Sequence, residues 1–254
     1  MVRSLDLKHN GLLESPTGTG KTLSILTGSL GWLRNRQVQG FNKNTKIFYA
    51  SRTHSQIKQL VKELKRTCYK PIMTILGSRD HLCVNPQLTN SHGNEKNNAC
   101  AMLTKMKKCN YLTNLEDKKN KIMTHYKHRH MDIEDLVSEG TSHQFCSFYF
   151  SRTLLSKAHI IFLPYNYLMN SEYRGMLKKH LEDSIIIFDE AHNLARIAEE
   201  SYSIKYSVSD LRRVKENMNE MRRLLSKSNK ATEMEKDDVE TQVETLKMLV
   251  TDFS

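Results

Sequence analysis

The sequence predicts an α/β fold built on a parallel β-sheet. Short apolar runs with strand character recur along the chain, and several are followed by segments whose apolar residues repeat at helical spacing. A glycine-rich turn near the N-terminus lies between one such run and one such helical pattern. This alternation of strand and helix is typical of parallel sheets covered by helices.

The first unit surrounds the stretch Glu14–Thr22, which reads ESPTGTGKT. Gly11–Leu13 before it has strand character, and a helix is expected after it. The helix is indicated by the spacing of Leu23, Leu26, Leu30 and Leu33. A polar surface connection is expected over residues 34–45.

A glycine-rich turn that opens a helix can cradle phosphates, because its backbone N–H groups converge on one point. Gly18 and Gly20 permit close approach, Lys21 can reach the β- and γ-phosphates, and the Thr22 hydroxyl can bind Mg²⁺. Ser15 occupies the place where the usual pattern has glycine, so an ordinary turn remains the alternative. The candidate phosphate-contacting residues are Ser15, Pro16, Thr17, Gly18, Thr19, Gly20, Lys21 and Thr22.

Four further apolar runs predict the rest of the sheet, which we expect within residues 11–192. They are Lys46–Ser51, Pro71–Leu76, His159–Pro164 and Ser184–Glu190. The last two are nearly continuous, as expected of strands buried on both faces. A helix over Ile57–Leu64 is expected after the first of the four.

The overall composition indicates a soluble intracellular protein with a polyanionic partner. Of 254 residues, 39 are Lys or Arg and 28 are Asp or Glu, giving a net charge of +11. Nucleic acid is therefore the first partner to test, although a merely basic protein is about equally compatible. Five cysteines and no secretory signal favour a reducing compartment. No apolar run is long enough to span a membrane.

A second motif supports a nucleotide site. Asp189 and Glu190 follow a buried strand, at the edge where α/β sheets bind ligands. Asp189 is the candidate Mg²⁺ ligand, Glu190 the candidate base for the attacking water, and His192 the candidate γ-phosphate sensor. Together with Lys21, they predict an ATPase. A P-loop kinase or GTPase is disfavoured, because no phosphoacceptor site or base-specificity loop is apparent.

Three stretches resemble the first motor domain of superfamily 2 DEAH-type helicases, and more narrowly the xeroderma pigmentosum group D family. They are Glu14–Thr22, Tyr49–Gln56 and Asp189–His192, and the resemblance spans roughly residues 10–200. Ser15 is what this family carries at that place. Leu76–Asp80, Pro164–Leu168 and the string Ala50–Gln56 narrow the resemblance to one branch, which acts in telomere maintenance, DNA repair and recombination control.

The resemblance implies a RecA-like lobe with a [4Fe-4S] insertion between the third strand and the Pro-Tyr-Asn-Tyr motif. The matching ligands are Cys83, Cys100, Cys109 and Cys146. Their spacing alone left buried free thiols and a cluster open, and made structural zinc less favoured because no Cys-x-x-Cys pair occurs. Ser147 stands where relatives usually have Pro. Cys68 is outside the pattern and is expected to be buried or half-buried.

Basic residues dominate between Lys105 and Arg129, either as a solvated face or as a surface that contacts DNA phosphates beside the cluster. Four nearby aromatic residues could stack on bases or belong to the core: Tyr111, Tyr126, Phe148 and Tyr149. The resemblance assigns a DNA-backbone contact to Arg52, Thr53 and His54.

After Leu194 two amphipathic helices are expected. One carries Leu211, Val214, Met218, Met221, Leu224 and Leu225, and the other Val239, Val243, Leu246 and Val250. The expected division is a motor domain over 1–82 and 147–194, a cluster insertion over 83–146, and the start of a helical arch over 195–254.

The resemblance implies ATP-driven 5′-to-3′ unwinding of single-stranded and junction DNA in the nucleus, with ATP, Mg²⁺ and a [4Fe-4S] cluster as cofactors. Relatives carry an adenine-recognising Gln before the phosphate loop and a second motor lobe, and we expect both to be missing from this chain. The alternative is a non-catalytic ATP- and DNA-binding fragment or truncated isoform with a regulatory role.

Overall fold

The computed structural model describes residues 1–16, 18–40, 44–203, 207–227, 241 and 244–245. The chain divides into two compact units, Met1–Ser201 and Tyr202–Ser254. The first contains the sheet and every candidate site residue.

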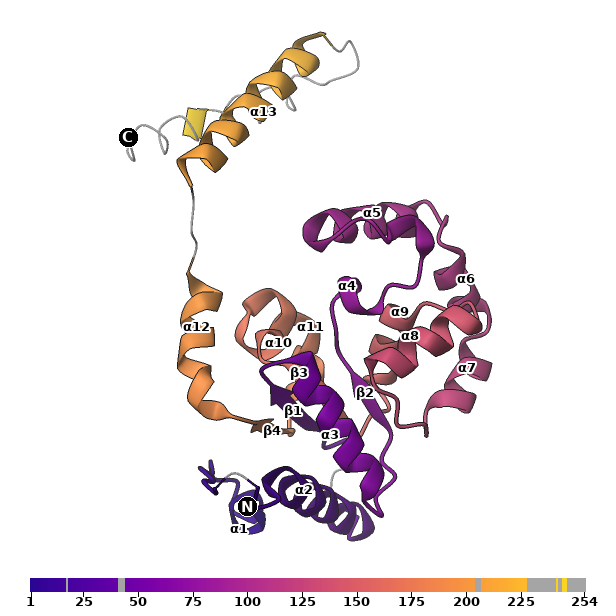
Figure 1. Ribbon diagram of the computed structural model, residues 1–254, viewed down its shortest axis with the longest axis vertical. Helices are drawn as coiled ribbons and strands as arrows, with labels where there is room; N and C mark the ends of the chain where they lie inside the picture. Colours follow the sequence, from indigo (N-terminus) through magenta and orange to yellow (C-terminus); the bar gives the residue numbers. More distant parts are fainter. Residues whose placement is uncertain (17, 41–43, 204–206, 228–240, 242–243, 246–254) are drawn as a thin grey trace. The chain divides into compact units, whose positions relative to one another are not determined.

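The first unit is built on a four-stranded parallel sheet (Figure 1). Its strands are ordered β2-β3-β1-β4, and β1 pairs with both β3 and β4. Tyr49 on β1 lies opposite Phe162 on β3 and Ile187 on β4. The strands are β1 (Ile47–Ser51), β2 (Met73–Ile75), β3 (Ile160–Pro164) and β4 (Ile185–Phe188). All four lie within runs that the sequence predicted as strands.

Helices precede or follow these strands, and a helical segment interrupts the strand-helix rhythm between β2 and β3. The helices are α1 (Val2–Asp6), α2 (Lys21–Val38), α3 (His54–Arg66), α4 (Arg79–Leu82), η1 (Pro86–Leu88), α5 (Gly93–Lys105), α6 (Asn110–Asp117), α7 (Lys119–Tyr126), α8 (Ile133–Ser142), α9 (Ser147–Leu154), α10 (Asn166–Met169), α11 (Ser171–Leu181), η2 (Ala191–Asn193), α12 (Leu194–Tyr202) and α13 (Val208–Lys227).

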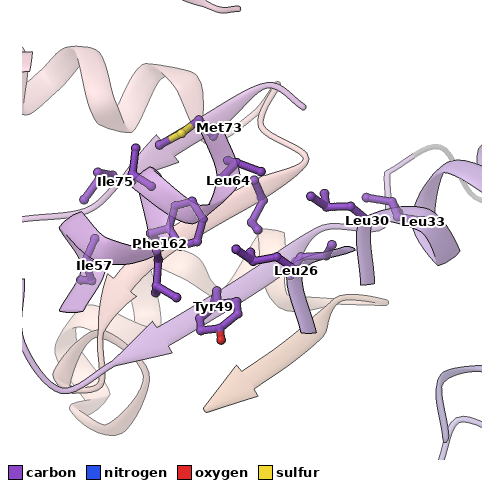
Figure 2. Packing of buried hydrophobic residues seen from close by; sticks show 13 residues of the cluster. Leu26, Leu30, Leu33, Tyr49, Ile57, Leu64, Met73, Ile75 and Phe162 are labelled. Atoms are coloured by element: carbon purple, nitrogen blue, oxygen red, sulfur yellow. The ribbon is translucent and has the colours of Figure 1, made fainter. Parts of the chain in front are cut away.

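Alternate residues of the buried strands supply the two faces of the core. On one face, Tyr49 and Phe162 pack with apolar residues of α2 and α3, including Leu26 and Leu64 (Figure 2). On the other face, Phe48 and neighbouring residues pack with Tyr165, Tyr167, Leu168 and Leu177 of the segment that follows β3. The sheet is therefore the middle layer of an α/β/α sandwich.

The segment between β2 and β3 has a core of its own. Tyr126, Phe145 and Phe150 form a buried aromatic group with ring centroids 5.2–6.0 Å apart. Ion pairs from Glu134 and Asp135 at the start of α8 reach Lys58 and Lys65 on α3. The segment is thus a packed layer of helices attached to the sheet's own helices.

The sequence predicted a strand at Gly11–Leu13, and this prediction was wrong. These residues form no strand, and Leu12 is 91% exposed and Leu13 48% exposed. Three residues of extended chain are stable only when their backbone groups are paired. The N-terminal segment instead forms α1, whose Asp6 carboxylate accepts a 2.7 Å hydrogen bond from the Trp32 indole on α2. The sheet accordingly begins at Ile47, not at residue 11.

Two related expectations also change. β4 was expected to be buried on both faces, but it is an edge strand and Ile186 is 45% exposed, because β1 is its only partner among the described strands. The polar stretch after residue 34 was expected to be a connection, but α2 continues to Val38. Arg and Gln are good helix formers, so polarity there marks the exposed side of the helix.

Of the second unit, the structure describes mainly α13. It confirms the first expected C-terminal helix, on which Val208 and Leu224 are more than 60% exposed. The second, with Val239, Val243, Leu246 and Val250, lies outside the described residues. No helix in the described part of the chain has the length and apolar character needed to cross a membrane.

Candidate functional site

The candidate phosphate loop ends where α2 begins. Gly18 and Gly20 have φ angles of 80° and 77°, a left-handed conformation that side chains disfavour, and Gly20 is the N-cap of α2. No side chain of the described residues caps this helix, which leaves its first N–H groups available to an anion. The loop thus has the backbone geometry of a phosphate cradle.

Hydroxyl groups hold the described part of the loop together. The side chains of Ser15 and Thr19 are in hydrogen-bond contact, and the Thr19 hydroxyl donates to the Pro16 carbonyl at 2.8 Å. Ser15 therefore closes the loop through its side chain at the place where the usual pattern has glycine. Thr17 was also predicted to contact phosphate, and it lies outside the described residues.

The acidic motif lies at the carboxyl end of β4. The Asp189 amide donates to the Ala50 carbonyl at 2.9 Å, which fixes the turn against β1. Burial raises the pKa of the Asp189 carboxyl, the Glu190 carboxylate raises it further, and the Lys21 ammonium acts in the opposite direction. The fold therefore brings Lys21 and Asp189, far apart in sequence, within electrostatic range.

Glu190 and His192 lie on one short turn beside Asp189. Glu190 has a left-handed backbone with φ 55°, an uncommon conformation for a residue with a side chain. Its carboxylate is 3.4 Å from Nδ1 of His192, and Nε2 of His192 is 2.9 Å from the Asn193 side-chain nitrogen. Glu190 and His192 are exposed, so a ligand bound at this edge could reach both.

The candidate DNA-contacting residues follow β1 at the same edge, because the carboxyl ends of parallel strands lie together. Thr53 is the N-cap of α3 and forms a reciprocal capping box with Gln56. Arg52 is exposed beside it. The rings of His54 and His81 are in contact, tilted at 56° with centroids 4.1 Å apart, and burial together with His81 lowers the pKa of His54 to about 4.

Sequence reasoning missed two buried tyrosines close to the acidic motif. Tyr49 and Tyr165 are at most 1% exposed, and neither hydroxyl has a hydrogen-bond partner among the residues that the structure describes. Burial raises both pKa values, that of Tyr165 to about 12, and the charge of Asp189 adds to the effect. In Figure 2 the Tyr49 hydroxyl points away from the apolar side chains around it. For Tyr49, a tyrosine inside an otherwise apolar strand was the available signal.

The four predicted cluster cysteines line one cavity of about 10 Å³ between the helices of the insertion. Cys83 is half-buried, and Cys100, Cys109 and Cys146 are buried. Burial raises the pKa of the Cys146 thiol to about 12, and the other three cysteines contribute to the rise. The Asn85 side chain donates to the Cys109 sulfur at 3.7 Å. Residues spread over more than sixty positions of sequence are thus neighbours.

The chemistry of these donors fits an iron–sulfur cluster, since four cysteine thiolates are its usual ligand set. Within the described part of the chain, however, no three His, Cys, Asp or Glu side chains are arranged so that they could hold a metal ion. The structure therefore brings the four thiols to one cavity and does not itself show a cluster.

A guanidinium–phenyl–guanidinium stack adjoins the cysteine cavity and was not predicted. The Arg79 and Arg152 guanidinium carbons lie 4.1 Å and 3.4 Å from the Phe148 ring centroid. Arg152 also donates to the Gly77 carbonyl at 3.2 Å, just after β2, and contacts the Tyr167 hydroxyl at 3.5 Å. These contacts connect the cysteine cavity to the ends of β2 and β3.

The predictions for individual residues in and near the insertion had mixed outcomes. Tyr126 and Phe148 are 3% and 5% exposed and belong to the core, so neither is available to stack on a base. Cys68 was expected to be at least half-buried, but it is exposed, because it follows the end of α3 on a surface turn. Ser147 is fully buried and donates to the Leu136 carbonyl at 2.7 Å, in space that Gly140 leaves open.

Comparison with known protein families shows to which family this chain belongs. Residues 49–211, from β1 into α13, match the DEAD_2 family. The chain belongs to the DEAD_2 family. The match includes β1, the cysteine-bearing insertion and the acidic motif, and it begins after the phosphate loop.

Among DEAD_2 relatives are proteins named regulator of telomere elongation helicase 1 homolog, the branch that the string Ala50–Gln56 predicted. The protein from Drosophila mojavensis is 40% identical over 243 residues, which cover 80% of this chain and 24% of the relative. The protein from Arabidopsis thaliana is 40% identical over 235 residues, covering 80% and 22%. The chain thus spans about a quarter of the length of these relatives.

Two solved structures share the fold. One is named XPD_Helicase, with a TM-score of 0.55, 19% identity, and coverage of 99% of this chain and 45% of the other. The second, named Truncated XPD, has a TM-score of 0.56, 19% identity, and coverage of 99% and 74%. These likenesses confirm the predicted α/β fold with a parallel sheet.

Proposed function

We propose that this chain is the first motor lobe of an ATP-dependent DNA helicase. The observation that carries the proposal is that the phosphate loop ending at Lys21, at the start of α2, and Asp189, at the end of β4, lie within electrostatic range of each other. An uncapped helix N-terminus and a lysine can bind the phosphates of a nucleoside triphosphate, and a carboxylate can bind its magnesium ion. Membership of the DEAD_2 family supports the helicase role.

Each side chain of the site has a proposed role. The loop from Ser15 to Thr22 holds the phosphates through backbone N–H groups, and Lys21 neutralises the β- and γ-phosphates. Glu190 accepts a proton from the attacking water, and His192 reports the state of the γ-phosphate to the turn it shares with Glu190. Thr22 and Asp189 offer the oxygen donors that Mg²⁺ prefers, and the bound ion would supply charge neutralisation for the phosphates.

DNA is the proposed partner, as single strands and junction structures. Arg52, Thr53 and His54 lie at the same edge of the sheet as the acidic motif. Single-stranded DNA bound there would therefore be close to the proposed site of ATP hydrolysis. The name of the relatives, regulator of telomere elongation helicase 1 homolog, supports a helicase role in telomere maintenance. The 5′-to-3′ direction, the roles in DNA repair and recombination control and the nuclear location are proposed from the sequence resemblance alone.

We propose that the chain alone hydrolyses ATP slowly. The relatives are about four times as long, and the second motor lobe with its arginine finger would come from polypeptide outside these 254 residues. An arginine finger contributes roughly 10³ to 10⁵ in rate at related phosphoryl-transfer sites. Robust unwinding by the purified 254-residue chain would contradict this expectation.

We propose that residues 83–146 form a [4Fe-4S] insertion within a motor domain of residues 1–82 and 147–194. Residues 195–254 begin a helical arch. The proposed cluster ligands are Cys83, Cys100, Cys109 and Cys146. The convergence of four thiols on one cavity supports the ligand assignment. The cluster would cross-link four points of the insertion. After anaerobic purification we expect iron and sulfide in the protein and their loss in Cys109→Ser, with Cys68→Ser as the matched control. Iron-free, zinc-loaded protein would overturn the assignment.

Nucleotide binding provides the direct test of the ATP site. A fluorescent ATP analogue should bind the chain in the presence of Mg²⁺, and Lys21→Ala should weaken binding at least about tenfold, since a charge-assisted contact to phosphate contributes roughly 1.5–3 kcal/mol. Lys62→Ala, which removes the same charge from an exposed position of α3, is the matched control. Equal binding by the Lys21 and Lys62 variants would refute the site.

The second candidate function is a non-catalytic ATP- and DNA-binding fragment with a regulatory role. The exposure of Leu12 and Leu13 favours it, because the segment that leads into the phosphate loop is not anchored in the sheet. Measuring ATP hydrolysis with and without single-stranded DNA separates the two. Binding of both ligands with no DNA-stimulated hydrolysis, even after addition of the second lobe, would favour the regulatory role.

A further inference from the structure

A second basic site lies away from the acidic motif. An open hollow of about 530 Å³ is bordered by the end of α3, the residues before β2 and the connection from α7 to α8. α3 starts where β1 ends and runs back along the sheet, and Lys70 precedes β2. The hollow is therefore at the amino edge of the strands, opposite Asp189 and Arg52.

Basic side chains from separate parts of the chain meet in this hollow. Lys65 and Lys70 come from the end of α3 and the residues after it, and His128, Arg129 and His130 come from the connection after α7. The Nε2 atom of His130 contacts the Pro71 carbonyl at 3.0 Å, which holds the two segments together. Packing of the fold, not sequence proximity, creates this concentration of charge.

The acidic side chains of the hollow neutralise only part of that charge. Asp135 pairs with Lys65 at 3.1 Å, and Glu139 pairs with Arg129 at 2.8 Å. Lys70 and His128 are exposed, and the described residues give neither of them an ion-pair partner. The hollow therefore keeps hydrogen-bond donors and positive charge available for an anionic ligand.

We propose that this hollow binds phosphate groups of the DNA backbone as a second nucleic-acid contact, separate from the carboxyl edge. Its volume is within the range of ligand sites that hold a nucleotide-sized group. Lys118, Lys119 and Lys121, at the start of the helix whose end adjoins the hollow, are also exposed. Backbone phosphates bind lysine and arginine without regard to base sequence.

This site differs from the surface that the sequence suggested. The basic stretch was expected to contact DNA beside the cysteines, whereas its last residues face α3 and the start of β2. The inference takes DNA as the partner from the proposed function and requires neither ATP nor the cluster.

The test is DNA binding by the whole chain without nucleotide. Fluorescence anisotropy with a labelled 20-nucleotide single strand at about 0.1 M salt is compared for wild type, the double variant Lys70→Ala/His128→Ala, and the control Lys62→Ala. We expect the double variant to bind about three- to tenfold more weakly and the salt slope to fall by about one, as for the loss of a phosphate contact. Binding equal to the control would overturn the proposal.

A gain-of-charge variant tests the same site in the opposite direction. Glu139→Gln keeps the shape of the side chain and can still accept a hydrogen bond from Tyr126, but it releases the charge of Arg129. We expect tighter DNA binding in this variant, and unchanged or weaker binding would count against the site. Melting temperatures verify folding, and Lys70→Gln replaces the double variant if that variant is unstable.

Two further outcomes separate the possible ligands and the two proposals. Inorganic phosphate or pyrophosphate at millimolar concentration should compete with DNA for wild type and less for the double variant. A hollow that binds pyrophosphate without any effect on DNA binding would be a site for a small phosphate compound and would refute the proposal. If the wild type binds no DNA, the proposed function fails as well; if only the Lys70/His128 comparison is flat, the inference alone fails.

Discussion

Two tyrosine hydroxyls show how the same side chain can either oppose or support the fold. The Tyr49 hydroxyl is fully buried without a partner in the described part of the chain, whereas the Tyr126 hydroxyl donates to the Glu139 carboxylate at 2.8 Å. A buried polar group without a hydrogen bond costs about 1–3 kcal/mol, and a hydrogen bond to a charged acceptor contributes a similar amount. The difference arises entirely from the neighbours.

We therefore predict opposite effects for two chemically identical substitutions. Tyr49→Phe should raise the free energy of unfolding by about 1 kcal/mol in the absence of nucleotide, because it removes an unsatisfied hydroxyl. Tyr126→Phe should lower it by about 1–2 kcal/mol. Urea unfolding followed by circular dichroism measures both, and a destabilised Tyr49→Phe protein would show that its hydroxyl has a partner, such as an ordered water.

The charge of Asp189 should make stability depend on pH. Burial raises the pKa of its carboxyl, so the folded state binds a proton more readily than the unfolded state does. The contribution of this residue to stability is therefore largest at low pH and decreases as the pH rises through the two pKa values. Asp189→Asn, which cannot ionise, should avoid that decrease.

The corresponding measurement compares melting temperatures of wild type and Asp189→Asn across pH. We expect the variant to be more stable at pH 7, and the difference to disappear below about pH 3, where both side chains are neutral. Glu182→Gln, at an exposed carboxylate, is the control. A variant that is less stable than wild type at pH 7 would mean that Lys21 outweighs burial.

At the scale of elements, α3 runs from the carboxyl ends of the strands to their amino ends. Its N-cap Thr53 belongs to the candidate DNA-contacting motif, and Lys65 near its end lines the basic hollow. Ile57, Leu60 and Leu64 on its inner face are all at most 2% exposed. The helix is thus anchored along its whole length, and its two ends carry separate chemical groups.

The capping box of α3 permits a test of structural against DNA-binding roles. Thr53→Ala should lower the free energy of unfolding by about 1 kcal/mol, because it removes the hydroxyl that accepts a hydrogen bond from the backbone amide of Gln56. Thr53→Ser should retain the cap. Chemical denaturation gives the stability and anisotropy gives DNA affinity. Should Thr53→Ala leave stability unchanged, the capping interaction would contribute nothing in solution.

The sequence predicted the elements whose signals are local. Continuous apolar runs such as Ile160–Leu163 identified the strands, and the spacing of Ile57, Leu60 and Leu64 identified α3. Gly11–Leu13 was misassigned because an apolar run becomes a strand only when another strand pairs with it, and pairing is not visible in a window of sequence. For the same reason β4 was expected to be covered on both sides.

Parts of the site were predictable to different degrees. Lys21 and Asp189 were identified from motifs and the four cysteines from the family resemblance. The structure places the first two in electrostatic range and the cysteines around one cavity. The Arg79–Phe148–Arg152 stack and the unpaired Tyr49 hydroxyl could not be predicted, because they depend on how distant segments pack. The individual roles of these residues remain predictions.

At the scale of the whole first unit, positive charge and apolar surface lie in different places. The basic hollow is at the amino edge of the sheet, whereas Ile186 exposes apolar surface along β4 at the side of the sheet. A strand with an uncovered edge offers unpaired N–H and C=O groups to other chains. Self-association through β4 is the expected result.

We predict that the purified chain forms oligomers as its concentration rises, and that Ile186→Lys reduces this tendency, since a charge on an edge strand opposes pairing with another edge. Sedimentation velocity over a hundredfold range of concentration measures the effect. Leu224→Lys, at an exposed apolar position of α13, distinguishes edge pairing from association through the second unit. Identical sedimentation of wild type and Ile186→Lys would exclude the edge as the interface.

The edge of β4 that no other described strand pairs with also affects how a measured DNA affinity is interpreted. Two chains paired along their β4 strands would present two basic hollows to one DNA molecule, so the second contact would form at a high effective concentration. Long DNA would then bind far more tightly than a 20-nucleotide strand, without any new contact in either chain. Comparing Ile186→Lys with wild type on short and long DNA would separate this avidity from the intrinsic affinity of a single hollow.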